Sequence, residues 1–392
     1  MNSLGINKDP KDTKIVVAMS GGVDSSVVAC MLKEQGYDVI GITLQLYDIG
    51  KTLKKKNACC AGVDIMDAKK VADKHNFPHY VLNYENLFRE SVIDDFADSY
   101  LRGETPIPCV RCNQSVKFRD LMKVARDLGA EALATGHYVR RVGAENVDLA
   151  SEDLALRGFD GNAQLHKAVD ENKDQSYFLF ATTKEQLDFL RFPLGGFKKE
   201  HTRELALKYG LEIANKPDSQ DICFVPNGDY ASVIAKHRPQ AFKEGELRHI
   251  ETGAILGRHN GIINFTLGQR RGLGISYPEP LYVVKIEPKE NVVFVGEEKF
   301  LQNRRFIVRE MNWLIDENFA NLAEIEGKKG FEALVRLRSN HEEEKATIYP
   351  LANNEVEIVM KSMTRAITPG QACVIYDGDR VLGGGWITKE VA

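Results

Sequence analysis

The first half of the chain alternates short apolar runs with stretches that carry apolar residues at helical spacing. The β-branched run Ile15 to Met19 precedes a helical pattern at Val27 to Gln35, and a second buried-type run spans Asp38 to Leu44. A later run, Ala132 to Thr135, ends in Gly136-His137-Tyr138. Alternating strands and helices predict a parallel sheet with helices on both faces, and ligands bind beyond the carboxyl ends of such strands.

The same pattern predicts further helices and one short strand between and after these runs. Prolines mark the segment Thr105 to Asn113 as a loop. Residues 140–161 are acidic and irregular, which predicts a surface excursion. The expected helices cover about 64–75, 85–101, 115–128, 184–189 and 202–209, and the expected strand covers 79–82.

Beyond Asn227 the pattern changes to short alternating strands with glycine-containing turns. Leu267 to Gly274 is a basic glycine-rich loop, and Tyr282 to Val295 has the pattern of a hairpin. From about Arg305 the spacing predicts several short strands, which is typical of a small β-barrel. Those strands are expected at 333–337, 346–349, 356–360, 372–376 and 381–386.

Length and charge narrow the class of protein. A chain of 392 residues exceeds the roughly 250 to 300 residues at which one core stops growing, so we expect two or three domains. The net charge of −4 gives no global basic signal, so contacts with nucleic acid need local patches. No apolar run approaches the roughly 20 residues that span a bilayer, and the first 14 residues are polar, so we expect a cytoplasmic protein without a membrane segment.

The turn after the first strand has the composition of a phosphate site. Gly21 and Gly22 allow a sharp turn and close approach of a ligand, and the serines and free N–H groups of the first helical turn offer donors to an anion. The turn is neither a Walker motif nor GxGxxG. It resembles the PP-loop of ATP pyrophosphatases, which adenylate a substrate oxygen and release pyrophosphate. The alternative is an ordinary strand-turn-helix corner with Asp24 as a helix-start residue.

Seven cysteines form an odd set in a chain without a secretion signal, which indicates thiols used for chemistry or metal. Cys109 and Cys112 form a C-x-x-C. We expect Arg111 and the helix near Ser115 to favour the Cys112 thiolate. A zinc site is the alternative, but the sequence has no second C-x-x-C or Cys/His pair at the spacing of zinc ligands. Cys30 and Cys373 are expected in the core, and Cys59 and Cys60, in a loop, are given no catalytic task.

Seven motifs together resemble the tRNA-specific 2-thiouridylase (MnmA) family over nearly the whole length. They are AMSGGVDSS (Ala18 to Ser26), TPIPCVRCN (Thr105 to Asn113), ATGHY (Ala134 to Tyr138), NKDQSYFL (Asn172 to Leu179), DSQDICF (Asp218 to Phe224), TLGQRRGLG (Thr266 to Gly274) and TPGQA (Thr368 to Ala372). The resemblance implies an α/β chain with a PP-loop, Rossmann-like parallel sheet domain (1–220), a small, mostly β central domain (221–298) and a C-terminal β-barrel that contacts tRNA (299–392).

The resemblance also implies a reaction. ATP, with Mg²⁺, adenylates the 2-oxygen of the wobble uridine in tRNAs for Lys, Glu and Gln, and a persulfide sulfur then displaces AMP to give 2-thiouridine. Cys223 matches the persulfide carrier, and Cys112 matches the partner that attacks it or assists sulfur release through a transient disulfide. The expected sulfur donor is a cysteine desulfurase or a sulfur-relay protein. We expect a monomer.

Further site residues are carried over from the matching motifs. The ATP-binding set comprises Ala18, Met19, Ser20, Gly21, Gly22, Val23, Asp24, Ser25, Leu44 and Gly136. The tRNA-binding set comprises Ile107, Pro108, Cys109, His137, Lys173, Asp174, Gln175, Arg338, Ser339 and Gln371.

Cys109 departs from the family pattern, in which many members have an aspartate that is a candidate general base. The departure leaves Asp221 or a water to handle the proton. Alternatively, Cys109, Cys112 and Cys223 form a three-thiolate set that holds a [4Fe-4S] cluster with one open iron. We favour the persulfide route.

RNA physics adds two expectations. The wobble base must leave its stack to be modified, and phosphates must meet local basic patches, so binding should weaken with salt. The patches are 269–271, 336–338 and 54–56. Alternative functions are a PP-loop ligase for a small carboxylate or nucleotide, a 4-thiouridine or lysidine synthase, and a non-catalytic RNA-binding protein. A PP-loop ligase for a small molecule would not need the three cysteines. The 4-thiouridine and lysidine synthases do not have the motifs in this order. The third conflicts with the intact Ser20 to Ser26 segment and Cys223.

Overall fold

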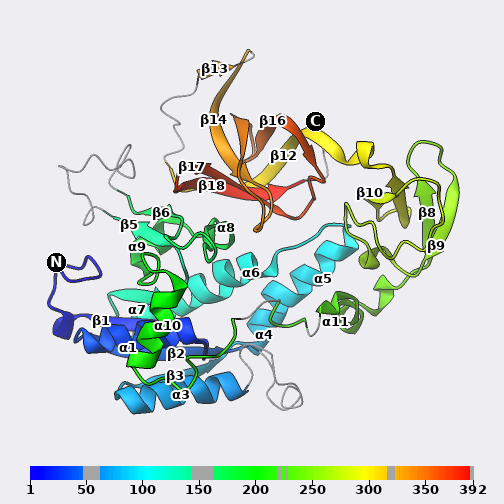
Figure 1. Cartoon of the computed structure of the whole chain (residues 1–392). Coiled ribbons are helices and arrows are strands. Elements are labelled where there is room, and N and C mark those ends of the chain that lie inside the picture. Colours follow the sequence, from blue (N-terminus) through cyan, green and yellow to red (C-terminus); the bar gives the residue numbers. More distant parts are fainter. Residues whose placement is uncertain are drawn as a thin grey trace. The chain divides into compact units, whose positions relative to one another are not determined.

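The computed structural model describes residues 1–46, 62–143, 162–218, 222–225, 228–315, 323–325 and 327–388 (Figure 1). The chain forms two compact units. The first comprises 1–91, 109–227 and 379–381, and the second comprises 92–108, 228–378 and 382–392. The division into three domains with boundaries at 220 and 298 stays a prediction.

A parallel five-stranded sheet forms the centre of the first unit, as the alternating pattern predicts. Its order is β3-β2-β1-β4-β7, and each neighbouring pair is parallel. The interior residues of β1 are fully buried because both faces of the strand are covered. The strands are β1 (Lys14–Ala18), β2 (Asp38–Gln45), β3 (His79–Asn83), β4 (Ala132–Thr135) and β7 (Leu190–Arg191).

The strand order reverses once, and this reversal positions the site. The chain moves from β1 through α1 (Val23–Glu34) to β2, and through α3 (Gly62–His75) to β3, always in one direction. It then returns to the other side of β1 as β4. The crevice between the carboxyl ends of β1 and β4 is therefore the topological switch point, where open α/β sheets bind ligands.

The cysteine pair lies on a helix, so the predicted loop through Asn113 is wrong in its second half. The helical segment begins with α6 (Pro108–Arg111), continues as a π-helical stretch (Cys112–Asp120) and ends with α7 (Leu121–Asp127). Proline is tolerated in the first turn of a helix, where its missing N–H has no partner to lose. Pro108 therefore starts the helix, which the sequence analysis placed at 115.

Among the other helices of the first unit, α3 and α9 agree with the predicted ranges, whereas α8 (Ser176–Leu179) was not predicted. A capping box at Thr183 and Gln186 starts α9 (Lys184–Phe189). The helix expected at 202–209 begins earlier, as α10 (Lys199–Lys208). The first unit also contains α4 (Glu85–Phe88), α8 (Ser176–Leu179) and the antiparallel pair β5 (Arg140–Val142) and β6 (Gln164–His166).

The second unit contains a four-stranded sheet with the order β10-β11-β8-β9. The predicted hairpin is confirmed as the antiparallel pair β10 (Tyr282–Glu287) and β11 (Val292–Gly296). Beside it are β8 (Gly245–His249) and β9 (Ile255–His259). Helix α5 (Asp94–Leu101) packs against α11 (Tyr230–His237), with Tyr100 and Tyr230 stacked.

A closed β-barrel ends the chain, as the sequence predicts. The order β12-β16-β15-β14-β17-β18 is closed by pairing of β12 with β18 (Figure 1). Alternate inward residues, including Phe306, Ile358 and Cys373, form its core. The strands are β12 (Gln302–Trp313), β14 (Lys328–Arg336), β15 (Glu344–Pro350), β16 (Val356–Arg365), β17 (Ala372–Asp377) and β18 (Arg380–Ile387), and β13 (Ala323–Ile325) pairs with β14 outside this ring.

Candidate active site

The turn after β1 is built as a tight anion-binding loop. Gly21 has a φ of +74°, and a Cβ at this position would lie 2.1 Å from the carbonyl oxygen of Asp64. Glycine is therefore required both by the backbone conformation and by space. The Ser20 amide donates to Ser25 Oγ at 3.1 Å, and the two hydroxyl oxygens lie 3.2 Å apart. The loop thus presents two adjacent hydroxyls at the N-terminus of α1, where the helix dipole favours an anion.

Gly136, at the end of β4, lies directly against this loop. A Cβ on Gly136 would lie 2.7 Å from the Ser25 amide nitrogen and 2.9 Å from the carbonyl carbon of Asp24. Both neighbours are backbone atoms at the start of α1, so neither has a rotamer that makes room. The structure therefore brings together the two switch-point segments that the sequence assigned to ATP.

The other predicted ATP residues lie on the same elements. Ala18 ends β1, and Met19 and Val23 are buried on either side of the glycines. Leu44 is buried in β2, two residues beyond Ile42, which pairs with Ala18. Their assignment to ATP stays a prediction.

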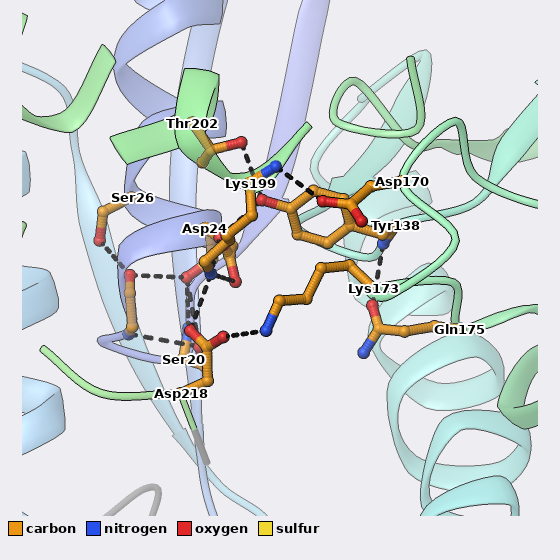
Figure 2. Close-up of polar contacts among 12 residues, drawn as sticks. Ser20, Asp24, Ser26, Tyr138, Asp170, Lys173, Gln175, Lys199, Thr202 and Asp218 are labelled. Atoms are coloured by element: carbon orange, nitrogen blue, oxygen red, sulfur yellow. Dashed lines mark hydrogen bonds and ion pairs between the residues drawn. The ribbon is translucent and has the colours of Figure 1, made fainter. Parts of the chain in front are cut away.

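A network of two carboxylates and two lysines joins this loop to the segment before Cys223 (Figure 2). Lys199 Nζ donates to both carboxylate oxygens of Asp24, at 2.7 and 2.9 Å. It also lies 2.8 Å from Asp218 Oδ1, and Lys173 Nζ donates to Asp218 Oδ2 at 2.8 Å. Burial would raise the pKa of Asp218, but hydrogen bonds from Lys173 and Lys199 lower it overall, so the carboxylate is ionised at neutral pH.

Tyr138 and Asp170 fix the position of Lys199. The Tyr138 hydroxyl lies 3.1 Å from Asp24 Oδ1 and 2.8 Å from Thr202 Oγ1, and its single proton can be donated to either oxygen. Burial and the charge of Asp24 raise the pKa of Tyr138, which keeps its proton. The Lys199 amide donates to Asp170 Oδ2 at 2.9 Å. The ammonium group is thus held over the start of α1.

Lys216 forms a second bridge to the glycine turn. Its Nζ donates to the Gly21 carbonyl at 3.0 Å, to Asp64 at 2.6 Å and to Asp67 at 2.9 Å. Burial alone would lower the pKa of Lys216, but the two carboxylates raise it, so the lysine stays charged. Asp64 and Asp67 lie in the first turns of α3, so Lys216 ties α3 to the PP-loop.

Sequence reasoning missed Lys199 and Lys216. A signal for Lys199 exists once the helix is known to begin there, because Lys199 is the first residue of α10 and a cation at a helix N-terminus opposes the helix dipole. Its side chain is only 6% exposed, and a buried cation needs anionic partners. Nothing in the local sequence indicates that these partners are Asp24 and Asp218.

Cys112 is buried, which overturns the expectation of a favoured thiolate. It is 7% exposed. Burial raises the pKa of the Cys112 thiol above its ordinary value, and the nearby positive charge of Lys117 lowers it by less. Arg111 donates instead to Gln114 Oε1 at 3.3 Å. The helix begins at Pro108, so its positive end lies before Cys109 rather than beside Cys112.

The burial predicts different reactivities for the two cysteines of the C-x-x-C. At pH 7 we expect iodoacetamide to modify the exposed Cys109 faster than Cys112, whose thiol is protonated. The Cys112 rate should keep rising as the pH is raised through 9, because the thiolate fraction grows up to a raised pKa. Peptide mass spectrometry measures both rates, and unfolding in guanidinium should remove the difference. Equal rates in the folded protein would contradict the buried, protonated thiol.

The structure does not gather the three candidate cysteines into a ligand set. Cys109 is exposed, Cys223 is partly exposed and Cys112 is buried. Among the described residues, no group of three or more His, Cys, Asp or Glu side chains is placed to hold a metal ion. The [4Fe-4S] cluster therefore does not fit the donors as this structure places them. Cys30 and Cys373 are buried core residues, as predicted, whereas Cys59, Cys60 and Asp221 lie outside the described residues.

The predicted tRNA-contact residues of the first unit surround the PP-loop network. Gln175 Oε1 accepts from the Tyr138 amide at 2.8 Å, which ties this turn to the segment after β4. Asp174 accepts from the Ser176 amide and hydroxyl, so it supports its own turn. His137 Nδ1 lies 2.8 Å from Thr135 Oγ1. Burial, and to a smaller extent the charge of Lys117, lowers the pKa of His137 to about 3, so the ring is neutral at physiological pH.

In the second unit, the predicted tRNA-contact residues converge on one turn. Arg338 donates to the Ala366 carbonyl and to Thr368 Oγ1, each at 3.0 Å. Gln371 Nε2 donates to the Thr105 carbonyl at 2.8 Å, which holds the segment before buried Ile107 and Pro108. Ser339 is exposed. Their role toward tRNA stays a prediction.

The predicted basic patches are only partly described. Arg336 forms an ion pair with Glu343 at 2.7 Å, so its charge is neutralised locally. Arg270 lines a cleft of about 400 Å³ in the loop after Thr266. The patch at 54–56 lies outside the described residues.

The sheet order, the loop at its switch point and the residues packed on that loop together define a PP-loop, ATP-utilising α/β enzyme. Family models match nearly the whole chain: a tRNA methyl transferase HUP domain at residues 13–227, a tRNA methyl transferase PRC-barrel domain at 231–297 and an aminomethyltransferase β-barrel domain at 303–387. The chain belongs to the tRNA-specific 2-thiouridylase (MnmA) family.

Two relatives illustrate the membership. The chain is 58% identical over 386 residues to tRNA-specific 2-thiouridylase MnmA of Rickettsia conorii, covering 98% of each chain. It is also 58% identical to that of Rickettsia massiliae, covering 98% of this chain and 100% of the relative. A 4-thiouridine synthetase crystallised with RNA and ATP matches 57% of this chain and 53% of its own, with 16% identity and a TM-score of 0.34. None of the described helices is long and apolar enough to cross a membrane.

Proposed function

We propose that this chain is an ATP-dependent tRNA-uridine 2-sulfurtransferase that converts the wobble uridine of tRNAs for Lys, Glu and Gln to 2-thiouridine. Membership in the 2-thiouridylase family supports the product. The observation that carries the mechanism is the PP-loop at the switch point, packed against Gly136 and linked by Lys199 to the Asp218 segment that leads to Cys223. A methyl transfer, which the domain descriptions name, needs no such triphosphate site.

The PP-loop supplies the activation step. Ser20, Ser25 and the first N–H groups of α1 would bind the phosphates of ATP, and Lys199 stands beside them as a buried cation. Attack of the uracil 2-oxygen on the α-phosphorus releases pyrophosphate and converts a poor leaving group into AMP. A bound Mg²⁺ would neutralise phosphate charge, and Asp24, the carboxylate in the first turn of α1, would hold it in exchange for Lys199, which now engages both of its oxygens.

The cysteines supply the second step. Cys223 would carry the terminal sulfur as a persulfide, which attacks C2 of the uracil ring, and AMP leaves. Cys112 would then take the Cys223 sulfur as a disulfide partner and release the transferred sulfur. The raised pKa of Cys112 keeps this thiol protonated in the resting protein, which protects the persulfide from premature cleavage.

The remaining proposals concern partners. The persulfide sulfur would come from a cysteine desulfurase or a sulfur-relay protein, and the chain would act as a monomer in the cytoplasm, where its tRNA substrate is found. The wobble base would be extruded from its stack to reach the reacting groups. We propose that Lys173, His137 and Arg338 are among the residues that contact the tRNA when the base is extruded.

The persulfide and cluster routes predict opposite results for the Cys109→Ala variant. Without a cluster, the variant should thiolate tRNA at close to the wild-type rate when supplied with a desulfurase and cysteine, because Cys112 and Cys223 remain. The measurement is ATP-dependent 2-thiouridine formation together with iron and acid-labile sulfide content of protein purified without oxygen. Activity that tracks iron and is lost in Cys109→Ala would overturn the persulfide route. If wild-type protein thiolates tRNA neither with iron bound nor without iron, the proposed function itself is overturned.

A further inference from the structure

The peptide bond between Gly21 and Gly22 has its carbonyl held from outside the loop. Lys216 Nζ donates to the Gly21 carbonyl oxygen at 3.0 Å, and the Gly22 amide nitrogen lies 3.4 Å from Ser20 Oγ. A trans peptide directs its C=O and its N–H to opposite sides. The bond from Lys216 therefore turns the Gly22 N–H toward the Ser20 hydroxyl. Ser20 is exposed whereas Gly21 is buried, so this N–H faces the open side of the PP-loop.

Neither glycine resists the opposite orientation of this peptide. Reversal of a peptide plane changes ψ of the residue before it and φ of the residue after it. Gly22 has a φ of −88°, and reversal would make φ positive, which glycine adopts about as readily as a negative value. The reversed peptide would turn the Gly21 carbonyl oxygen toward Ser20 Oγ and withdraw an N–H from that side. An external partner is therefore needed to hold the N–H there.

Lys216 uses all of its protons within the protein. An ammonium group has three N–H donors, and three acceptors surround Lys216 Nζ: the Gly21 carbonyl, Asp64 Oδ1 at 2.6 Å and Asp67 Oδ2 at 2.9 Å. Two carboxylates also outweigh its single charge, so the formal charge of these three side chains is −1. The effect of Lys216 on a bound anion therefore runs through the Gly21 carbonyl rather than through direct contact.

Helix α3 fixes the ammonium group beside the loop. Asp64 and Asp67 are three positions apart on this helix, so their side chains lie on one face. The backbone of Asp64 also packs on the loop, because a Cβ on Gly21 would lie 2.1 Å from the Asp64 carbonyl oxygen. The same residue thus sets both the distance of α3 from Gly21 and the position of Lys216 Nζ.

We propose that Lys216 is a positioning residue that locks the Gly21–Gly22 peptide with its N–H toward the phosphate site. The inference rests on the proposed function, because it takes ATP as the ligand of the PP-loop. In the locked orientation the Gly22 N–H adds a donor beside the hydroxyls of Ser20 and Ser25. In the reversed orientation a carbonyl oxygen would face the phosphate oxygens and repel them. The lock makes and breaks no covalent bond.

The test is calorimetric titration of the full chain with inorganic pyrophosphate. Lys216→Met removes the ammonium group and keeps an unbranched side chain. We expect pyrophosphate to bind about ten- to a hundredfold more weakly, the usual effect of losing one hydrogen bond to a charged group. The circular dichroism spectrum should be unchanged.

Gly22→Ala supplies a second way to hold the peptide. A residue with a Cβ disfavours positive φ, and a Cβ at position 22 would meet the rotatable Ser20 hydroxyl at 3.3 Å. The loss of affinity caused by Lys216→Met should therefore be several-fold smaller when Gly22→Ala is already present. A role of Lys216 limited to folding would not be rescued in this way.

Lys74→Met is the matched control. Lys74 also joins α3 to a glycine carbonyl, that of Gly210, but it lies in the last turn of the helix, at the opposite end from Asp64. This variant should bind pyrophosphate like the wild type. Wild-type affinity in Lys216→Met, an equal loss with and without Gly22→Ala, or an equal loss in Lys74→Met would overturn the lock.

Thiolation of tRNA by the wild-type sample is assayed in parallel. If the wild type binds pyrophosphate and thiolates tRNA while the Lys216 variants behave otherwise than expected, only the lock is overturned. If the wild type neither binds pyrophosphate nor thiolates tRNA, the proposed function is overturned, and the lock with it.

Discussion

Replacement of Gly136 by alanine is expected to reduce ATP-dependent thiolation by about 100-fold, the loss typical of a catalytic group displaced by a fraction of an ångström to 1 Å. The added Cβ would lie 2.7 Å from the Ser25 amide nitrogen and 2.9 Å from the Asp24 carbonyl carbon. Because both are backbone atoms, the start of α1 must move away from β4. The hydroxyl pair of Ser20 and Ser25 and the carboxylate of Asp24 then lose their common geometry.

The defect should appear in the nucleotide step. We expect a raised KM for ATP and a reduced kcat, measured as tRNA-dependent pyrophosphate release, with the circular dichroism spectrum unchanged. Gly196→Ala is the control, since a Cβ there meets nothing within 4 Å. It should retain wild-type kinetics. A Gly136→Ala enzyme as active as Gly196→Ala would show that the close packing of β4 on the PP-loop is not needed for ATP use.

The sequence was sufficient for four of the five strands of the sheet and for the turn at its switch point, whereas the two-residue strand β7 was not predicted. Buried strands such as β1 carry a run of β-branched residues. Gly21 adopts a positive φ, and a sharp turn at this position is already indicated by the strand before it and the helix after it. Barrel strands such as β15 and β17 contain short apolar runs that the sequence also shows, although the long strand β12 was not among the predicted ranges. These features depend on local pattern, so their element types and approximate ranges were predicted.

The lysine bridges were not predicted, because they join residues far apart in the sequence. Lys199 meets Asp24 across 175 positions, and Lys216 meets Asp64 across 152. The state of Cys112 was mispredicted for a related reason. Arg111 is its neighbour in the sequence, but the pKa is set by burial, which depends on packing of the whole helical segment. The misplaced helix start had a local cause, since Pro108 begins the helix instead of ending a loop.

Replacement of Cys223 by serine is expected to abolish 2-thiouridine formation while the adenylation step survives. The variant keeps the PP-loop, Gly136 and the lysine network, so ATP should still react with the wobble uridine. No persulfide can form on an oxygen, so nothing displaces AMP. Pyrophosphate release should therefore stop after about one equivalent per enzyme-bound tRNA, in contrast to continued release by the wild type.

Cys112→Ser separates the two thiol roles. It should accept the persulfide sulfur on Cys223 from a desulfurase, detected as a mass increase of the Cys223 peptide, but should fail to turn over because the disulfide partner is missing. Cys109→Ala should support both loading and turnover. Wild-type thiolation by Cys223→Ser would contradict the persulfide assignment. Absence of the pyrophosphate burst in that variant would mean that adenylation itself requires Cys223. The two half-reactions would then depend on each other, although the described contacts place Cys223 in neither the PP-loop nor the lysine network.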